Sequence, residues 1–448
     1  MKKLARTVLI TFILGLLCAG PDSATSDAST KSTLTRYEDF VVLSGAEFSQ
    51  LLEAEVSDFR MYSCEGGACA PVSVQIDKVD SADRYVFPDE LNPDRDGSAL
   101  DKNDEISFMA EDAGDRLSGG WWPKGATAGV EIELLDPLDN GRAWLYLFAQ
   151  PGSPVPETTD YVSYSYDGTN TVIQSSQFVL AERDSLFGYD QMRLTSPGGE
   201  LGPDILDRHR NGVELSVAGD ISLALSVPES MVRNETAGII DGPVRLVRDV
   251  MVMVHVGELS FDWGTEYYVR YYRCGHNNKV KYELPVSLKD LAGSILYYFS
   301  LDFTQDMIGS NYIDQNQPEP VVISNGPRKG VPNDAPHFWW GVYGDNGGVI
   351  QAVDLNEDLV PYFTCDGRWI QKPGALVKRG DDPGRLEIGF GCHEIGDMPD
   401  ATEFGWSNYI MFPKDPSREG IIALGNIFQD PLQVKVRDLE WATQTERN

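Results

Sequence analysis

Strict alternation of apolar and polar residues runs through most of the chain and constrains its fold more than any other feature. Clear examples are segments 72–77, 129–135, 143–148, 160–166, 250–256, 266–273 and 347–353. A period of two is typical of antiparallel strands, whereas helices repeat their apolar residues every three to four positions. Helical spacing is confined to short stretches near 46–55, 204–209 and 287–292. We therefore expect an all-β protein, a large antiparallel β-sandwich or supersandwich with few short helices.

Turn-forming residues separate these segments. The 448 residues include 43 Gly and 26 Pro, which suits many short strands joined by tight turns. The strand pattern is interrupted near residues 180–200, so we expect an N-terminal β-sandwich region at 35–185 and a C-terminal one at 186–448. One large sandwich that crosses this point fits the sequence equally well.

The N-terminus has the pattern of an export signal. Three basic residues precede an uncharged, mostly apolar run at 8–18, and this run is shorter than the roughly 20 residues that a membrane-spanning helix needs. We expect a signal peptide at 1–24 and a flexible linker at 25–34. The mature protein would then be extracytoplasmic, whether periplasmic, attached to the outer membrane or secreted.

Cys18 ends the apolar run, where a lipoprotein cysteine would lie. The small residue expected just before such a cysteine is absent, because Leu17 stands there. A lipid anchor at Cys18 is therefore the less favoured alternative. No later segment is long and apolar enough to suggest a transmembrane helix.

Five further cysteines could form disulfides in an oxidising compartment. Cys64 and Cys69 enclose a flexible Glu-Gly-Gly-Ala loop and could close a small ring, and Cys365 and Cys392 could join two strands. Cys274 would then be left as a buried thiol. The chain has no Cys-x-x-Cys motif, so neither a c-type haem nor a zinc knuckle is expected.

Acidic residues outnumber basic ones, with 69 Asp and Glu against 37 Lys and Arg and a formal net charge of −32. This balance argues against a nucleic-acid partner and against adsorption on an anionic membrane, because both are bound through clustered Lys and Arg. It does not indicate disorder, since 42% of the residues are hydrophobic, enough to form a core.

Part of this acidity is concentrated on one segment, 89–105, which Gly97 allows to turn tightly. Closely spaced carboxylates on such a loop can supply the oxygen ligands that Ca²⁺ prefers. We expect a structural Ca²⁺ site, although the segment fails as an EF-hand loop, and a solvated acidic turn is the alternative. The candidate ligands are Asp94, Asp96, Asp101, Asp104 and Glu105.

Motifs around this loop resemble a known pattern. Val74-Gln-Ile-Asp77, Asp94-x-Asp96-Gly97 and Asn103-Asp-Glu-Ile-Ser-Phe108 resemble motifs of an uncharacterised family of secreted bacterial β-sandwich proteins encoded beside polysaccharide-degrading enzymes. The segment 241–248, Asp-Gly-Pro-Val-Arg-Leu-Val-Arg, resembles the start of a strand in the galactose-mutarotase-like supersandwich group. The resemblance implies a sandwich and contact with carbohydrate, and it implies no mechanism.

Two aromatic segments are candidates for ligand binding. Tyr268, Arg270 and Tyr272 share one face of the expected strand at 266–273, where rings and a cation could stack on a sugar and bind its hydroxyls. The favoured alternative is a half-buried strand whose tyrosines belong to the core.

The second segment, 334–346, is denser in chemistry-bearing residues. It could line a sugar cleft in which His337 or Asp345 acts as general acid or base. An aromatic-filled structural corner is the favoured alternative, because Trp is mostly a packing residue. The aromatic residues of this segment proposed to contact a ligand are Trp339, Trp340 and Tyr343.

The chain shows no nucleophile elbow, phosphate-binding loop or His-Glu-x-x-His motif. The sequence therefore favours an exported β-sandwich protein that binds carbohydrate or another extracellular ligand, braced by Ca²⁺. The alternatives are a carbohydrate-active enzyme, either a polysaccharide lyase or a glycoside hydrolase, and a structural subunit of an extracellular assembly.

Overall fold

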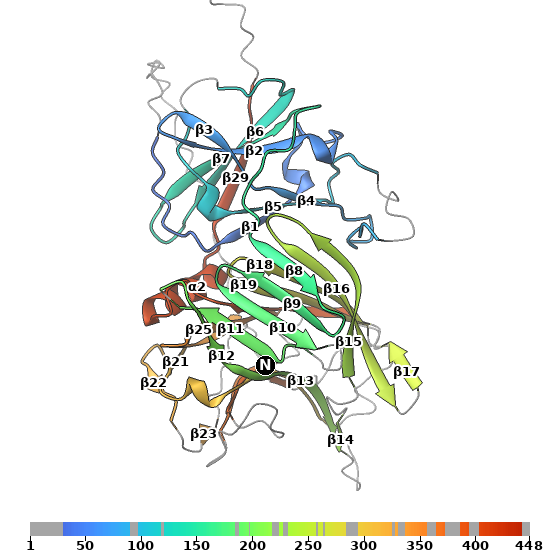
Figure 1. Ribbon diagram of the computed structural model, residues 1–448, viewed down its shortest axis with the longest axis vertical. Coiled ribbons are helices and arrows are strands. Elements are labelled where there is room, and N and C mark those ends of the chain that lie inside the picture. Colours follow the sequence, from blue (N-terminus) through green and yellow to red (C-terminus); the bar gives the residue numbers. More distant parts are fainter. Residues whose placement is uncertain are drawn as a thin grey trace, which may run out of the picture.

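The computed structural model describes the following residues: 30–89, 97–117, 121–183, 188–196, 198–216, 224–226, 232–256, 259–262, 265–283, 294–324, 328–329, 337–355, 364–371, 386–393 and 403–440. Antiparallel strands dominate this part of the chain, and its one α-helix is α2 (Arg418–Gln429) (Figure 1). The prediction of an all-β, antiparallel sandwich architecture with few helices is confirmed.

Two sheets form an N-terminal layer, which occupies the upper part of Figure 1. The five-stranded sheet has the order β29 (Gln433–Asp438), β6 (Ala128–Leu135), β7 (Arg142–Ala149), β2 (Phe59–Glu65) and β3 (Ala68–Val72). The three-stranded sheet has the order β1 (Phe40–Ser44), β5 (Glu105–Met109) and β4 (Gln75–Asp77). Alternation along β7 buries both of its faces, with Leu145 and Leu147 in the main core of the layer and Trp144 and Tyr146 in a smaller cluster.

The rest of the chain forms three sheets. The five-stranded sheet of this region has the order β12 (Leu201–Asp204), β11 (Gln191–Thr195), β10 (Phe178–Arg183), β9 (Asn170–Ser175) and β8 (Val162–Tyr166). The six-stranded sheet has the order β14 (Ala224–Ser226), β13 (Leu206–Ser216), β20 (Ser294–Phe303), β27 (Leu386–His393), β26 (Thr364–Gln371) and β23 (Arg328–Lys329).

The ten-stranded sheet is the largest and carries the candidate site. Its order is β15 (Val232–Asp241), β16 (Leu246–Val256), β18 (Thr265–Tyr272), β19 (Gly275–Glu283), β28 (Glu403–Met411), β25 (Gly347–Leu355), β24 (His337–Gly344), β21 (Asn311–Asp314) and β22 (Val321–Val322), with β17 (Leu259–Asp262) paired to β16. One of its faces packs on the other two sheets through a shared core that includes Val269, Trp340, Leu180, Leu301 and Phe390.

Helix α2 and strand β29 return the chain from this body to the N-terminal layer. Ser417 caps the helix by accepting a hydrogen bond from the Gly420 amide, and the helix buries Ile421 and Leu424. The next strand, β29, pairs with β6, so the C-terminal strand completes the N-terminal sheet (Figure 1). The division expected between residues 185 and 186 falls between β10 and β11, which belong to one sheet.

The helix predictions were partly wrong. Asp204 ends β12, and residues 206–209 belong to β13, which pairs with β20. The stretch near 46–55 holds a single short 3-10 turn, Gly45–Glu47, and α2 was not predicted. The stretch 287–292 lies outside the described residues.

The expected Cys64–Cys69 disulfide is confirmed, and Cys274 is a buried free thiol. Cys392 is disulfide-bonded, and the register of β26 with β27 sets Cys365 directly opposite it, which supports the expected pairing. Cys18 and the signal segment lie outside the described residues. Within the described part, no helix is long and apolar enough to cross a membrane.

Candidate functional site

One row of side chains crosses the ten-stranded sheet on the face toward α2 and the N-terminal layer. In the register, Arg270 stands opposite Asn277, Asn277 opposite Tyr409, Tyr409 opposite Ala352, and Ala352 opposite Trp339. Residues that face each other across paired strands point to the same side of a sheet. Three strands therefore place Tyr409 and Trp339 on one surface with only a methyl group between them.

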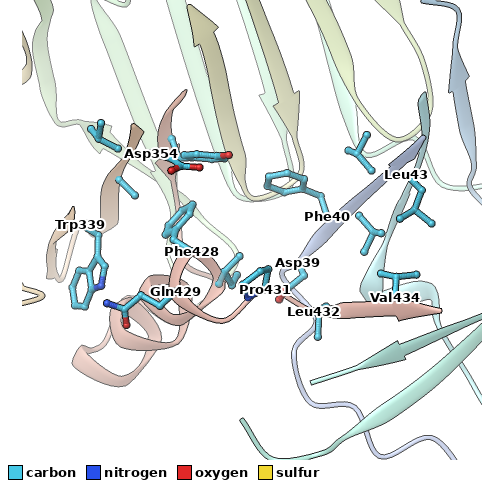
Figure 2. A pocket seen from close by; sticks show the side chains of 16 residues that line it. Asp39, Phe40, Leu43, Trp339, Asp354, Phe428, Gln429, Pro431, Leu432 and Val434 are labelled. Atoms are coloured by element: carbon cyan, nitrogen blue, oxygen red, sulfur yellow. The ribbon is translucent and has the colours of Figure 1, made fainter. Parts of the chain in front are cut away.

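A pocket of about 340 Å³ lies over this methyl group, and we call it the Trp339 pocket. Its floor includes Trp339, Ala352 and Tyr409, and segments from both ends of the described chain cover it (Figure 2). The covering residues are Phe40 and its neighbours on β1, Ile427, Phe428 and Gln429 of α2, and Pro431, Leu432 and Val434 near β29.

Helix α2 reaches the pocket because Gly425 lets it approach Trp339. A Cβ at position 425 would lie 2.6 Å from Cε2 of the Trp339 ring, closer than any side chain allows. The glycine therefore lowers helix propensity but admits the indole, which is a packing reason for its position. Trp339 is buried, and its Nε1 has no hydrogen-bond partner among the described residues.

Two carboxylates line the pocket. Asp354 is exposed and its charge acts on Tyr409; it lies two residues along β25 from Ala352 and on the same face. Asp39 is buried and accepts a hydrogen bond of 2.6 Å from Arg36. Burial raises the pKa of Asp39 to about 6, although Arg36 opposes this shift.

The Tyr409 side chain is held by its neighbours. Asn277 and Ser407 hydrogen-bond it, while burial and the nearby Asp354 charge raise its pKa. The Oδ1 atom of Asn277 is buried and has no partner within the described part of the chain. The pocket combines the flat rings of Trp339 and Tyr409 with the exposed polar groups of Asp354 and Gln429.

A second polar cluster lies further along the same face, and we call it the Arg245 network. Arg245 is fully buried between β15 and β16, and its Nη2 lies 2.6 Å from Oδ2 of Asp77 and 2.6 Å from Oε2 of Glu105. Gln75 Oε1 accepts hydrogen bonds from the amides of Val244 and Arg245, at 3.1 and 2.9 Å. The network thus ties β4 and β5 of the N-terminal layer to the ten-stranded sheet.

The motifs behind the family resemblance meet in this network. Gln75, Asp77 and Glu105 come from the first and third motifs, and Arg245 comes from the segment 241–248. A Cβ at Gly242 would lie 2.3 Å from Cδ of Gln75, so the Asp-Gly-Pro turn needs glycine there. These short motifs therefore have a structural explanation within this chain.

The network extends to β18. The Tyr85 hydroxyl donates to Oε2 of Glu105 and accepts from Nε of Arg270, both at 2.6 Å. Burial alone would raise the pKa of Glu105, but Arg245 and Arg270 hold it at about 2. The carboxylate is therefore ionised at any physiological pH.

The three residues proposed for ligand binding on β18 contact the protein itself. Tyr272 stacks on Phe40 with ring centroids 3.8 Å apart, and Tyr268 meets Tyr85 edge to face at 5.1 Å. Arg270 and both tyrosines are buried. The alternative interpretation, that these tyrosines belong to the core, agrees with these contacts, and ligand binding by them stays a prediction.

The candidate residues of segment 334–346 lie in different parts of the structure. Trp339 lines the pocket, whereas the neighbouring Trp340 is fully buried on the opposite face and stacks with Tyr312. Tyr343 is buried in the cluster beside α2, and Asp345 is exposed in the turn between β24 and β25. The backbone of His337 pairs with that of Asp354, and the structure does not describe the His337 side chain.

The proposed Ca²⁺ ligands that the structure describes also take part in different contacts. Asp104 is buried and bonded to Lys78 at 2.7 Å, and Glu105 belongs to the Arg245 network. Asp101 accepts from the Asn103 amide, while Asp94 and Asp96 lie outside the described residues. In the portion of the chain that the structure covers, no three acidic, His or Cys side chains are grouped as a metal site. Calcium binding stays a prediction.

Sequence reasoning missed most of the pocket. Asp39, Phe40, Asp354, Tyr409 and Phe428 come from segments that are far apart in the chain. The one available signal was the apolar spacing of the α2 segment behind Ser417, which indicates an amphipathic helix with a face to bury.

Comparison with known proteins does not assign this chain to a family. No family model matches the chain, and no curated protein matches it. Among solved structures, the chain is similar to an alpha-mannosidase from Enterococcus faecalis V583, with 10% sequence identity and a TM-score of 0.37. The alignment covers 92% of this chain and 46% of the mannosidase, so the chain spans less than half the length of that protein. A likeness this low carries no statement about activity.

Proposed function

We propose that this chain is an exported β-sandwich protein that binds carbohydrate in the Trp339 pocket. The observation that carries the proposal is the row Tyr409–Ala352–Trp339, which leaves space between two aromatic side chains on a rigid sheet. Sugars are bound by stacking of their apolar faces on flat rings, with polar groups fixing their hydroxyls.

The pocket has the size and polarity that this role needs. Its volume of about 340 Å³ lies near the lower end of ligand sites, which span roughly 300–1,000 Å³. Asp354 and Gln429 are exposed at its edge and offer a carboxylate and an amide to ligand hydroxyls.

Export is supported by the N-terminal sequence pattern and by the Cys64–Cys69 disulfide, because disulfides persist in oxidising compartments. A structural Ca²⁺ in the acidic loop belongs to the same proposal. Lys78 lies 2.7 Å from Asp104 and 3.5 Å from the partly exposed Asp101, and Glu105 pairs with Arg245. The proposal therefore keeps Asp94, Asp96 and Asp101 as the candidate ligands.

A glycan panel tests the binding proposal, with retention on affinity gels followed by calorimetry. At least one glycan should bind, and Ala352→Leu should abolish binding because the added side chain fills the space between Tyr409 and Trp339. The matched control is Ala423→Leu, the same change on the exposed face of α2. Failure of the whole panel, or unchanged binding by folded Ala352→Leu protein, would overturn the proposal.

The same samples test the two alternatives. New reducing ends or unsaturated sugars in the glycan mixtures would indicate a carbohydrate-active enzyme. Large species in light scattering would indicate a subunit of an assembly. A monomer that retains a glycan without altering it is the outcome that the proposal expects.

A further inference from the structure

We propose that His209 and His276 form an acid-sensitive latch inside the three-sheet body, which consists of the ten-stranded sheet, the six-stranded sheet and the sheet from β8 to β12. The neutral imidazoles pack these sheets together, and their protonation in mild acid loosens the sheets from one another. This role does not depend on the ligand of the Trp339 pocket. Three features of the described residues carry it: the position of the two rings, their unbonded nitrogens and the charges around them.

The two histidines lie where the three sheets meet. His209 is on β13 of the six-stranded sheet, and His276 is on β19 of the ten-stranded sheet. Tyr189 directly precedes β11 of the third sheet, and its ring stacks on that of His209 with centroids 5.6 Å apart. The same ring meets His276 edge to face at 5.2 Å. One tyrosine ring thus contacts an imidazole from each of the other two sheets.

The ring nitrogens of this pair are mostly unbonded. Both residues are buried, with 3% of His209 and 1% of His276 exposed. Among the described residues, Nδ1 and Nε2 of His209 and Nε2 of His276 have no hydrogen-bond partner, while Nδ1 of His276 lies 3.0 Å from Oδ1 of Asn278. A Cβ at Gly188 would lie 2.9 Å from Nδ1 of His209, so the chain packs closely on this ring. A proton added here would bring a charge to a site with almost no acceptor for it.

Uncharged groups face the pair from the neighbouring strands. His209 stands opposite Leu301 of β20, and His276 stands opposite Tyr271 of β18 and Ile410 of β28. The Tyr189 hydroxyl donates to that of Tyr271 at 2.8 Å. Burial raises the pKa of Tyr271 to about 12 and that of Tyr189 well above its ordinary value, so both hydroxyls stay neutral.

The charged groups of this region pair with each other and not with the histidines. Glu182 of β10 and Arg248 of β16 bond each other and act on the nearby tyrosines. On β13, Arg210 points to the opposite face from His209 and pairs with Asp302 at 2.9 Å. Within the described part of the chain, no carboxylate bonds either imidazole. A protonated histidine would therefore lack a counter-ion.

The two side chains favour the closed body only while they are neutral. Burial lowers the pKa of His209 to about 4 and that of His276 to about 3, from the ordinary 6.5. The loosened state takes up protons below about pH 6.5, whereas the closed state does so only near its lower pKa values. Their stabilising effect is thus complete above about 6.5 and is lost as the pH falls toward 4 and 3. Within this range each histidine raises the equilibrium constant for opening by up to about tenfold per pH unit.

Two buried carboxylates act in the opposite direction. Burial raises the pKa of Asp39 and Asp112 to about 6, so both favour folding as the pH falls from above 6 toward 4. Comparison of the parent protein with histidine variants removes this contribution, because both carboxylates are present in every protein compared.

Urea titrations between about pH 4 and 7.5 isolate the pair. His209→Phe keeps a ring on Tyr189 but takes up no proton, so from about pH 6.5 to 4.5 its equilibrium constant for unfolding should rise at least about tenfold less than that of the parent. Tyr189→Phe is the matched control, since it removes the 2.8 Å bond to Tyr271 and keeps both histidines. It should change stability by the same amount at every pH. Parallel profiles of His209→Phe and the parent would overturn the proposal.

The parent protein gives a test that needs no substitution. In NMR spectra of isotope-labelled imidazoles, His209 and His276 should stay neutral in the folded protein at about pH 5. Hydrogen exchange, corrected for the pH dependence of the chemical step, should become at least about tenfold faster on β13 and β19 between about pH 7 and 5 and change little on β6 and β7. Protonation of all five histidines near their ordinary pKa, or an equal change in exchange on both pairs of strands, would overturn the proposal.

Discussion

The Arg245 network and the Trp339 pocket lie on the same face of the ten-stranded sheet, yet their polar groups are satisfied to different degrees. In the network, Gln75, Asp77 and Arg245 bond one another at 2.6–2.9 Å across two sheets. In the pocket, the polar side chains of Asp354 and Gln429 are exposed beside the open space. Satisfied buried groups hold a structure together, whereas exposed polar groups around an open space can meet a ligand.

The largest expected effect comes from breaking the network. Asp77→Ala leaves the guanidinium of Arg245 buried with part of its charge uncompensated, so the free energy of unfolding should fall by about 3–5 kcal/mol in urea titrations. Arg437→Ala is the matched control: Arg437 is half-exposed, and its partners Glu131 and Glu133 keep ion pairs with Arg116 and Arg142. This change should cost about 0–1 kcal/mol. Equal effects of the two variants would mean that the network does not hold the layers together.

A pH series distinguishes the carboxylates of the two regions. The pKa of Glu105 is lowered to about 2 in the fold, so its stabilising effect is complete above about 4.5 and is lost as the pH falls toward 2. Burial raises the pKa of Asp39 to about 6, so its ionised form opposes folding, and stability should rise as the pH falls from above 6 toward 4.

Variants isolate these two contributions. Relative to the parent protein, Glu105→Gln should flatten the stability profile between about pH 2 and 4.5, and Asp39→Asn should flatten it between about pH 4 and 6. At about 1.4 kcal/mol per pKa unit, the contribution is at most about 3.5 kcal/mol for Glu105 and about 3 kcal/mol for Asp39. Parallel profiles for Glu105→Gln and the parent would contradict the assigned role of Glu105.

Calcium removal tests the acidic loop that leads into the network. If the ion binds the folded loop alone, EDTA should lower the melting temperature, and Ca²⁺ but not Na⁺ should restore it. The stabilisation is about 2–3 kcal/mol when free Ca²⁺ exceeds the dissociation constant by about 100-fold. The double variant Asp94→Ala, Asp96→Ala should not respond to EDTA, and an unchanged response would reject the site.

The strands could be predicted from local sequence because each segment shows the two-residue period by itself. Leu145 and Leu147 alternate with Trp144 and Tyr146, and the two sets enter different cores, as such a pattern indicates. The helical prediction for 204–209 was wrong because pairing of β13 with β20 outweighs the local helical spacing of this stretch.

The sequence predicted only the part of the candidate site in which aromatic and ionisable residues lie close together along the chain. Trp339 was identified within an aromatic cluster, but its partners Tyr409 and Phe40 are remote along the chain. The space over Ala352 depends on the register of three strands, which the sequence does not specify. The motif residues Gln75, Asp77 and Arg245 were identified as a pattern, and only their contacts explain it as a link between layers.

The smallest effect is expected from removing one hydroxyl in each region. Tyr409→Phe keeps the ring in the pocket but loses the hydrogen bonds to Asn277 and Ser407, so glycan affinity should weaken by less than tenfold. Tyr272→Phe loses a 3.3 Å hydrogen bond from Arg245 and should lower stability by about 1 kcal/mol without changing affinity.

Calorimetry and urea titration on this matched pair test whether the two regions have separate roles. Both variants delete the same atom from a tyrosine on one face of one sheet, so a general loosening of the sheet would alter affinity in both. Loss of affinity in Tyr272→Phe, or complete loss in Tyr409→Phe, would contradict the division between a network that stabilises and a pocket that binds. An effect on affinity confined to Tyr409→Phe would support it, because only Tyr409 of the two lines the pocket.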